Sequence, residues 1–163
     1  MKIEEKWVYP APGDRVYAMI IDPAFQDAKC MAARATEHSV DVQKTQEGHT
    51  VVTHRSMSTS SFPSQFKSMV GDSLQIVETQ AWGFADGDGN RSADLIVEIK
   101  GVPVGLTGTI TATTHGPDTV MQMAGDLKAR IPLFGGKVEQ AAAPAIVSAI
   151  QSEAETGKGY LAS

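Results

Sequence analysis

The sequence predicts an α+β fold in which a curved antiparallel sheet of about seven strands wraps around a long C-terminal helix. One strand-like segment and two short helical segments open the chain, six strand-like segments follow, and one long helical segment comes last. Strands joined by short turns pair antiparallel, whereas parallel strands need long crossover connections. Because the chain has 163 residues, we expect a single domain over residues 1–163.

The first part of the chain is expected to hold one strand and two short helices. Bulky side chains alternate over residues 2–9, which is typical of a strand, and prolines end it. Apolar residues at helical spacing predict a short helix after Asp14, with Asp14 as its N-cap. A second short helix is predicted over residues 24–34, after the break at Asp22 and Pro23.

Six further strands are predicted between Ala35 and Ile131, because apolar and β-branched residues alternate in each of them. Turn-forming residues separate these strands, and the strongest cluster of them covers residues 86–90. The aspartates of this cluster suggest a calcium loop, but Arg91 and Val97 occupy the positions where an EF-hand loop has glycine and an acidic ligand. We therefore predict a hairpin turn there.

The last predicted element is a helix from Lys137 to about Thr156, with Gly157 as its C-terminal stop. Pro144 lies inside it and is expected to kink or split the helix, because proline removes a backbone hydrogen bond. Apolar residues recur at spacings of three and four and form one stripe: Val138, Ala142, Ala145, Ile146, Ala149 and Ile150. Alanines in this stripe leave space between the helix and the sheet.

Charge and composition exclude several classes of function. A net charge of −5 without a basic cluster argues against nucleic-acid binding. No apolar run approaches the roughly 20 residues of a membrane span, so we expect no stable membrane insertion. The charged, proline-broken N-terminus is unlike a signal peptide, and Cys30 is the only cysteine. A cytoplasmic protein is the expectation.

Neither a metal nor a cofactor is expected. The four histidines do not have the spacing of zinc ligands: His38, His49, His54 and His115. Nucleotide-binding and hydrolase motifs are absent as well.

The order of elements and four short segments resemble a known group of proteins. The segments are Tyr9–Pro12, Val16–Tyr17, Glu78–Trp82 and Ile131–Glu139. The chain is similar to the START-like (SRPBCC), or helix-grip, superfamily, and within it to an uncharacterised bacterial family. That superfamily includes polyketide cyclases, plant ligand carriers of the pollen-allergen type and lipid-transfer domains. The resemblance implies a pocket between the concave sheet and the final helix.

Arg55 is the first candidate for this pocket. It alternates with Val51, Thr53 and Met57, so one strand face carries apolar groups and one guanidinium group. In an apolar pocket, Arg55 would orient a carboxylate or polarise a carbonyl group. Glu78 is the second charged candidate, either as the ion-pair partner of Arg55 or as a general base. An outward-facing pair of charges, or a purely structural pair, is the alternative.

The other candidates are apolar residues expected to face inward. Met side chains on the last strand adapt to irregular ligands, and ordinary core packing is the alternative for every residue in this set. The set consists of Leu95, Val97, Leu106, Met121, Met123, Leu127, Ile146 and Ile150.

The segment from Ser58 to Asp72 is longer than a hairpin loop of about 2–5 residues and carries Phe62 and Phe66. Two interpretations remain open for it. The segment is either a lid over the mouth of the pocket or a short helix that caps one end of the sheet. Phe62 and Phe66 are ligand-binding candidates in both.

The leading functional hypothesis is the binding or transport of a hydrophobic small molecule, such as a lipid, polyketide or isoprenoid-like compound, by a monomer or weak homodimer. One alternative is a cyclase, dehydratase or hydrolase that uses the same cavity, with candidates among Arg55, Glu78, His38 and His54. Another is a protein-interaction module that uses the segment Phe62–Val70.

Overall fold

The computed structural model describes residues 1–163 and contains eleven helices and strands. They are β1 (Lys2–Tyr9), α1 (Gly13–Ile20), α2 (Pro23–Ala32), β2 (Glu37–Lys44), β3 (Gly48–Ser58), α3 (Ser64–Val70), β4 (Ser73–Gly83), β5 (Arg91–Ile99), β6 (Val104–His115), β7 (Asp118–Ala129) and α4 (Gly135–Ala162). Ten of them follow the predicted order, and the additional helix α3 lies between β3 and β4. The predicted α+β fold is confirmed.

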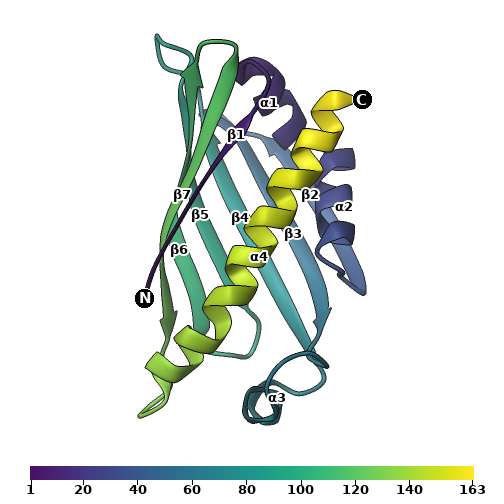
Figure 1. Cartoon of the computed structure of the whole chain (residues 1–163), viewed down its shortest axis with the longest axis vertical. Coiled ribbons are helices and arrows are strands. Elements are labelled where there is room, and N and C mark those ends of the chain that lie inside the picture. The colour runs from purple at the N-terminus through teal and green to yellow at the C-terminus, as the bar shows by residue number, and fades with distance from the viewer.

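All seven strands belong to one antiparallel sheet with the order β1-β7-β6-β5-β4-β3-β2. Strands β2 to β7 therefore follow one another as hairpin neighbours, as the short turns predict. The first strand pairs with the last, from Lys2 opposite Asp126 to Tyr9 opposite Thr119. The sheet curves, and Figure 1 shows α4 crossing its concave face diagonally.

Two facing glycines mark the curved part of β6 and β7. Gly108 lies opposite Gly125 in the register of these strands. A Cβ atom at Gly108 would overlap the carbonyl oxygen of Ala124, and one at Gly125 would lie 2.9 Å from a side-chain carbon of Leu106. Glycine in a strand commonly marks such a close approach or bend. Side chains at these two positions would force the strands apart.

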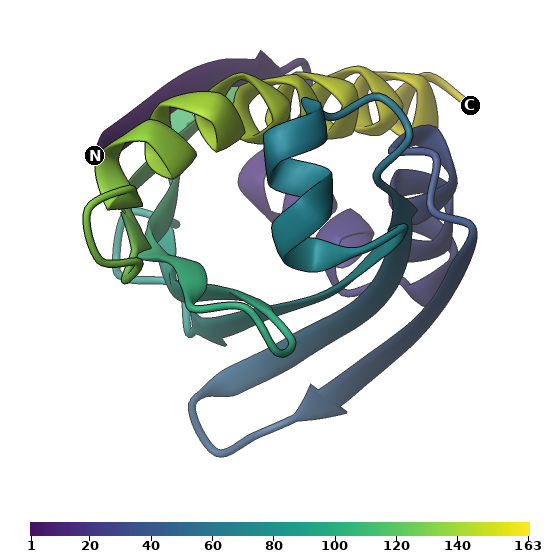
Figure 2. The same cartoon turned by 90° about the horizontal axis from the view of Figure 1, so that it is seen from below.

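The helices lie on the concave side of the sheet. Figure 2 shows the sheet passing around α4, with α1 and α2 packed at one end and α3 at the other. The most deeply buried apolar side chains lie where α1, α2 and α4 meet the sheet, among them Tyr9, Val16, Met19 and Phe25. The core thus fills one end of the concave side.

The structure of α4 differs from two expectations drawn from the sequence. It runs without interruption from Gly135 to Ala162, so it neither splits at Pro144 nor ends at Gly157. Proline removes only one hydrogen bond from this long helix, and packing against β1, β7 and α2 supports it on both sides of Pro144. Gly157 is buried against the ring of Tyr9, so its small size serves close packing rather than termination.

Local side-chain hydrogen bonds define the ends of several elements. Asp14 was expected to cap α1, but the N-cap residue is Pro12, and the Asp14 carboxylate accepts instead from the N–H of Arg15. Asp22 caps α2 by accepting from the N–H of Ala24 at 2.9 Å. In the predicted hairpin turn, the carboxylate of Asp86 accepts from two backbone N–H groups within residues 88–90.

No helix has both the length and the apolar character that a membrane span requires.

Candidate functional site

A cavity of about 880 Å³ lies between the concave face of the sheet and α4. This volume is within the range of roughly 300–1,000 Å³ that is typical of small-molecule sites. Seen from below in Figure 2, α3 lies across the lower end of this enclosure. The cavity therefore has a sheet wall, a helix wall and a closing segment.

The sheet wall is mostly apolar. Its residues follow the two-residue period of the strands, because alternate side chains of a strand point to the same face. Its apolar residues across β4 to β7 are Leu74, Ile76, Leu95, Val97, Ile99, Val104, Leu106, Ile110, Met123 and Leu127, and Glu78, Gln80 and Gly105 line the cavity as well.

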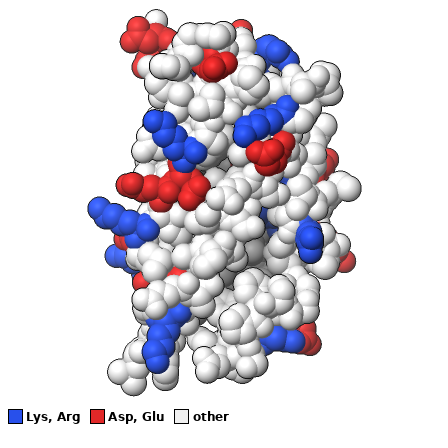
Figure 3. All heavy atoms as spheres, in the orientation of Figure 1, with Lys and Arg blue, Asp and Glu red and all other residues white.

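The helix wall is built mostly from small side chains. Alanines and serines leave volume that larger side chains would fill, as the sequence predicts. The lining residues of α4 are Ala141, Ala142, Pro144, Ala145, Ile146, Ser148, Ala149, Ile150, Ser152 and Glu153. Ala141, Pro144, Ala145 and Ser148 are also exposed, so the cavity opens to solvent along this edge of α4. In Figure 3 the surface between α3 and α4 is mostly uncharged.

Twelve of the fifteen candidate residues line this cavity: Arg55, Met57, Phe62, Phe66, Glu78, Leu95, Val97, Leu106, Met123, Leu127, Ile146 and Ile150. The other three are Val51, Thr53 and Met121, which are buried but do not line it. Helices α1 and α2 pack against β3 and β7 and fill that end of the concave face. These three residues therefore belong to the packed core.

The segment between β3 and β4 closes one end of the cavity. It contains the short helix α3, as one of the two interpretations predicts. Phe62 and Phe66 line the cavity, and the centroids of their rings lie 5.3 Å apart. Thr59 holds the ends of the segment together, because its hydroxyl donates to the carbonyl of Gly71 at 2.6 Å. Phe66 is buried and Phe62 half-buried, so the aromatic rings of this segment face the cavity, and its exposed large apolar side chain is Met69.

A cluster of charged side chains forms the polar end of the cavity, centred on Glu78. The carboxylate of Glu78 accepts hydrogen bonds from Lys29 at 2.8 Å, from Arg55 at 3.0 Å and from Gln80 at 2.7 Å. Gln80 in turn accepts from the indole N–H of Trp82 at 2.9 Å. Arg55 and Glu78 are thus an inward-facing pair, and the alternative of two outward charges is wrong.

Glu153 of α4 completes this cluster. Its carboxylate lies 3.5 Å from the Nζ atom of Lys29, which places Lys29 between two carboxylates from opposite walls. The sequence interpretation missed Lys29 and Glu153, although both carry a periodic signal. Lys29 is four residues after the buried Phe25, and Glu153 continues the stripe of Ile146 and Ile150.

Burial and mutual charge set the protonation of the cluster. Burial acts to raise the pKa of Glu78, but the charges of Lys29 and Arg55 and its hydrogen bonds outweigh this and lower the pKa to about 2. Burial acts to lower the pKa of Lys29, yet Glu153 and Glu78 raise it. For Glu153, burial raises the pKa and the charge of Glu78 adds to it, while Lys29 and Arg55 offset this only in part. Glu153 is the carboxyl group of the cluster that protonates most readily.

One donor of this cluster has no acceptor. The Nε atom of Arg55 is buried and makes no hydrogen bond. Buried polar groups in proteins nearly always have a partner. The polar end of the cavity is therefore able to donate a hydrogen bond to a bound molecule.

The histidines lie away from this cluster. His54 is exposed, and the ring of His38 lies 3.0 Å from the carboxylate of Asp27 near the surface. The Nδ1 atom of His49 forms a hydrogen bond with the hydroxyl of Tyr17 at 2.6 Å. His38 and His54 therefore do not join Arg55 and Glu78 at the cavity. No group of three or more His, Cys, Asp or Glu side chains is placed to hold a metal ion.

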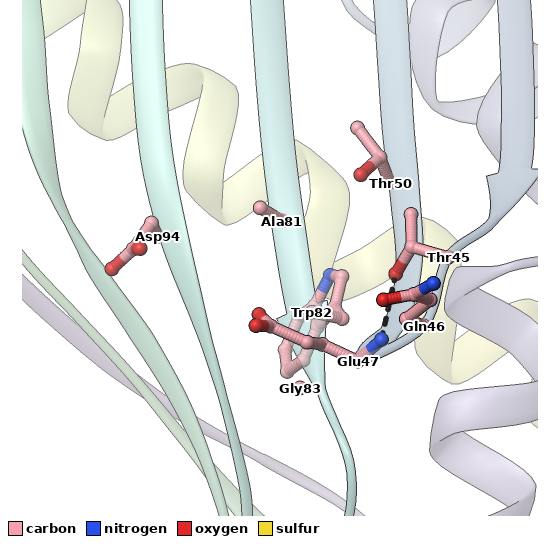
Figure 4. A pocket seen from close by; sticks show the side chains of 8 residues that line it. All are labelled: Thr45, Gln46, Glu47, Thr50, Ala81, Trp82, Gly83 and Asp94. Carbon is pink, nitrogen blue, oxygen red and sulfur yellow. Dashed lines mark hydrogen bonds between the residues drawn. The ribbon is translucent and has the colours of Figure 1, made fainter.

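A second, smaller hollow of about 380 Å³ lies at the turn between β2 and β3 (Figure 4). Its lining is mainly polar, and the backbone N–H of Glu47 donates to the hydroxyl of Thr45 there. Glu47 and Asp94 are its charged residues, and both are acidic. This hollow offers no cation and little apolar surface, so the large cavity is the better candidate for an apolar ligand.

A curved antiparallel sheet that encloses a cavity with a long C-terminal helix defines the START-like, helix-grip class of proteins. The chain belongs to the family described as "Protein of unknown function (DUF2505)", whose family model matches residues 5–161. No curated protein sequence matches it.

Three solved structures illustrate the similarity of fold. The Zhui aromatase/cyclase from a Streptomyces species has a TM-score of 0.65 at 11% identity, covering 98% of this chain and 92% of that one. Human STARD10 has a TM-score of 0.63 at 11% identity, and the match covers 98% of this chain and 64% of the STARD10 chain. A STAR-related lipid transfer protein from Xanthomonas axonopodis has a TM-score of 0.62 at 13% identity, and the match covers 99% of this chain and 86% of that one. Identities this low show the fold alone.

Proposed function

We propose that this protein binds a hydrophobic small molecule, such as a lipid, polyketide or isoprenoid-like compound, in the cavity between the sheet and α4, and that it does so as a monomer or weak homodimer. The observation that carries the proposal is a cavity of about 880 Å³ whose lining is predominantly apolar and whose buried charges are gathered in the cluster around Glu78. A ligand that buries about 300 Å² of apolar surface gains roughly 7 kcal/mol before the costs of immobilisation.

The similar folds support this proposal only in general terms. One of the similar structures is named as a lipid transfer protein and another as an aromatase/cyclase. A fold hosts many functions, so the argument rests on the cavity itself.

Mass spectrometry tests the proposal directly. Freshly purified protein is compared under native and denaturing conditions, and we expect an added mass that is lost on denaturation. Ala149 lines the cavity, so Ala149→Trp should fill it and remove the added mass. Gln151 is exposed on the same helix, outside the cavity, so Gln151→Trp is the matched control and should retain it. A bare protein mass after exposure to lipid extracts would argue against the proposal.

An enzyme of the cyclase, dehydratase or hydrolase kind is the second candidate, and Glu153 is the observation that favours it. A carboxyl group with a raised pKa at the edge of an apolar cavity suits general acid catalysis. The two candidates differ in what happens to the bound molecule. A binding protein should release the same compound from the wild type and from Glu153→Gln, whereas an enzyme should release product from the first and substrate from the second.

A further inference from the structure

The polar end of the cavity has more hydrogen-bond donors than acceptors. Glu78 accepts from three side chains, which occupies most of its acceptor capacity. Arg55 donates through one terminal nitrogen only, although a guanidinium group has five N–H donors, and its buried Nε has no partner. Because Arg55 lines the cavity and Glu78 uses only one of its terminal nitrogens, a bound molecule can supply an acceptor for the N–H groups that remain.

Building on the proposed binding function, we propose that the ligand of this cavity carries a carboxylate group, which accepts hydrogen bonds from Arg55 while the side chain of Glu153 takes up one proton from solvent. The only covalent bond formed is the O–H bond of Glu153. The ligand therefore has an apolar body, matching the walls, and one acidic end.

Charge balance explains why a proton accompanies the ligand. Without ligand the cluster holds two cations, Lys29 and Arg55, and two carboxylates, Glu78 and Glu153. A ligand carboxylate would bring the sum to one negative charge in a largely buried site. An uncompensated buried charge is costly, and protonation of one carboxylate removes it.

The contacts of the two carboxylates indicate that Glu153, and not Glu78, takes up that proton. Three donors hold Glu78 as a carboxylate, whereas Glu153 has Lys29 as its ion-pair partner at the longer distance of 3.5 Å. Burial and the charge of Glu78 already raise the pKa of Glu153, and a second carboxylate nearby would raise it further. Glu153 is therefore the carboxyl group that changes its charge on binding.

Charged and titratable groups from four neighbouring elements interact with Glu153. Lys29 comes from α2, Arg55 from β3 and Glu78 from β4. Tyr9 comes from β1, and burial, together with the charge of Glu153, raises the pKa of its hydroxyl, so it stays neutral. None of these groups replaces Glu153 as the proton acceptor near neutral pH.

The test compares two probes that differ only at the polar end, lauric acid and dodecanol, in calorimetric titrations from about pH 5.5 to about pH 8. We expect the acid to bind more tightly than the alcohol at the acidic end of this range. Its affinity should fall by up to about tenfold per pH unit above the pKa of Glu153, because one proton enters with it. Titrations in two buffers of different ionisation enthalpy should show uptake of that proton.

Two variants separate the roles of the residues. Glu153→Gln keeps the cluster without the titrating group, so acid binding should become independent of pH. Arg55→Gln should weaken acid binding by about tenfold or more and leave dodecanol binding nearly unchanged. Arg130→Gln is the matched control, since Arg130 is an exposed arginine outside the cavity, and it should leave both affinities unchanged.

The outcomes distinguish this inference from the proposed function on which it rests. If dodecanol binds as tightly as lauric acid at every pH, the cavity still binds apolar chains, but the carboxylate site and its proton are refuted. A pH dependence that survives in Glu153→Gln refutes the role of Glu153. If neither probe binds, the proposed function fails for such chains and this inference fails with it.

Discussion

The ring of Tyr9 lies directly against the backbone of Gly157, where the first strand meets the C-terminal part of α4. A Cβ atom at position 157 would stand 2.6 Å from both Cε1 and Oη of Tyr9, closer than such atoms pack. Tyr9 is 1% exposed, so its ring has little room to move aside. This contact fixes how closely α4 approaches the edge of the sheet.

Gly157→Ala should therefore destabilise the protein. Alanine is the better helix former by about 1 kcal/mol, but overpacking a rigid contact costs about 1–3 kcal/mol. We expect a net loss of about 1 kcal/mol in the free energy of unfolding, measured by urea denaturation. Gly159→Ala is the control, because nothing lies within 4 Å of a Cβ atom there, and it should stabilise slightly. Equal gains in both variants would show that Tyr9 yields easily.

Most of the fold follows from local patterns in the sequence. Alternation in the strands and short turns between them predict the hairpin order β2 to β7, and the structure has it. Apart from the N-cap of α1, which is Pro12 and not Asp14, the errors about the elements lie in α4, where proline and glycine were interpreted by their local preferences. Gly157 serves a contact with Tyr9, which is 148 positions earlier in the chain. Local reasoning has no access to a contact of that separation.

The sequence predicted most residues of the apolar walls of the candidate site, but only some residues of its polar end. The strand period identified the inward position of Arg55 and Glu78, because a strand face repeats every second residue. It did not reveal which end of that face the helices fill, so Thr53 was assigned to the cavity. Lys29 was missed because its partners lie on β4 and α4, and only the folded chain brings these together.

Glu78→Gln should be strongly destabilising near neutral pH, because it leaves Lys29 and Arg55 buried without their shared partner. Breaking a buried ion pair by removing one partner costs about 3–5 kcal/mol. The free energy of unfolding is measured by urea denaturation. Glu98→Gln is the control, since Glu98 is exposed on the neighbouring strand β5, and it should change stability by less than about 0.5 kcal/mol.

The same residue should make stability depend on pH in acid. The pKa of Glu78 is about 2 in the folded protein, below its ordinary value of 4.5. A lowered folded pKa means that the stabilisation is fully present above the ordinary value and is lost as pH falls towards the folded value. The difference in stability between the wild type and Glu78→Gln should therefore shrink between pH 4.5 and about 2. A constant difference over this window would show that Glu78 is not the group that titrates.

Phe66→Ala should loosen the closing segment of the cavity. Phe66 is 7% exposed and anchors α3 beside Phe62, and truncation of a buried phenylalanine costs about 3 kcal/mol or more. Hydrogen exchange should accelerate in α3 more than in the sheet, and a bound apolar molecule should dissociate faster. Met69→Ala on the same helix is the control, because Met69 is 46% exposed, and it should change neither property. If exchange accelerates equally everywhere, Phe66 supports the whole fold rather than this segment.

Pro144→Ala tests what the proline contributes to α4. Proline inside a helix is unfavourable by about 3 kcal/mol relative to alanine, because it lacks an N–H group and its ring meets the preceding turn. Pro144 is exposed at the mouth of the cavity, so alanine removes little packing there. We expect Pro144→Ala to raise the free energy of unfolding by about 1 kcal/mol or more, measured by urea denaturation. Ala145→Pro, on the next position of the same exposed edge, should do the opposite and destabilise. If Pro144→Ala lowers stability instead, the ring of Pro144 makes contacts that outweigh the missing hydrogen bond, and the shape of the mouth depends on it.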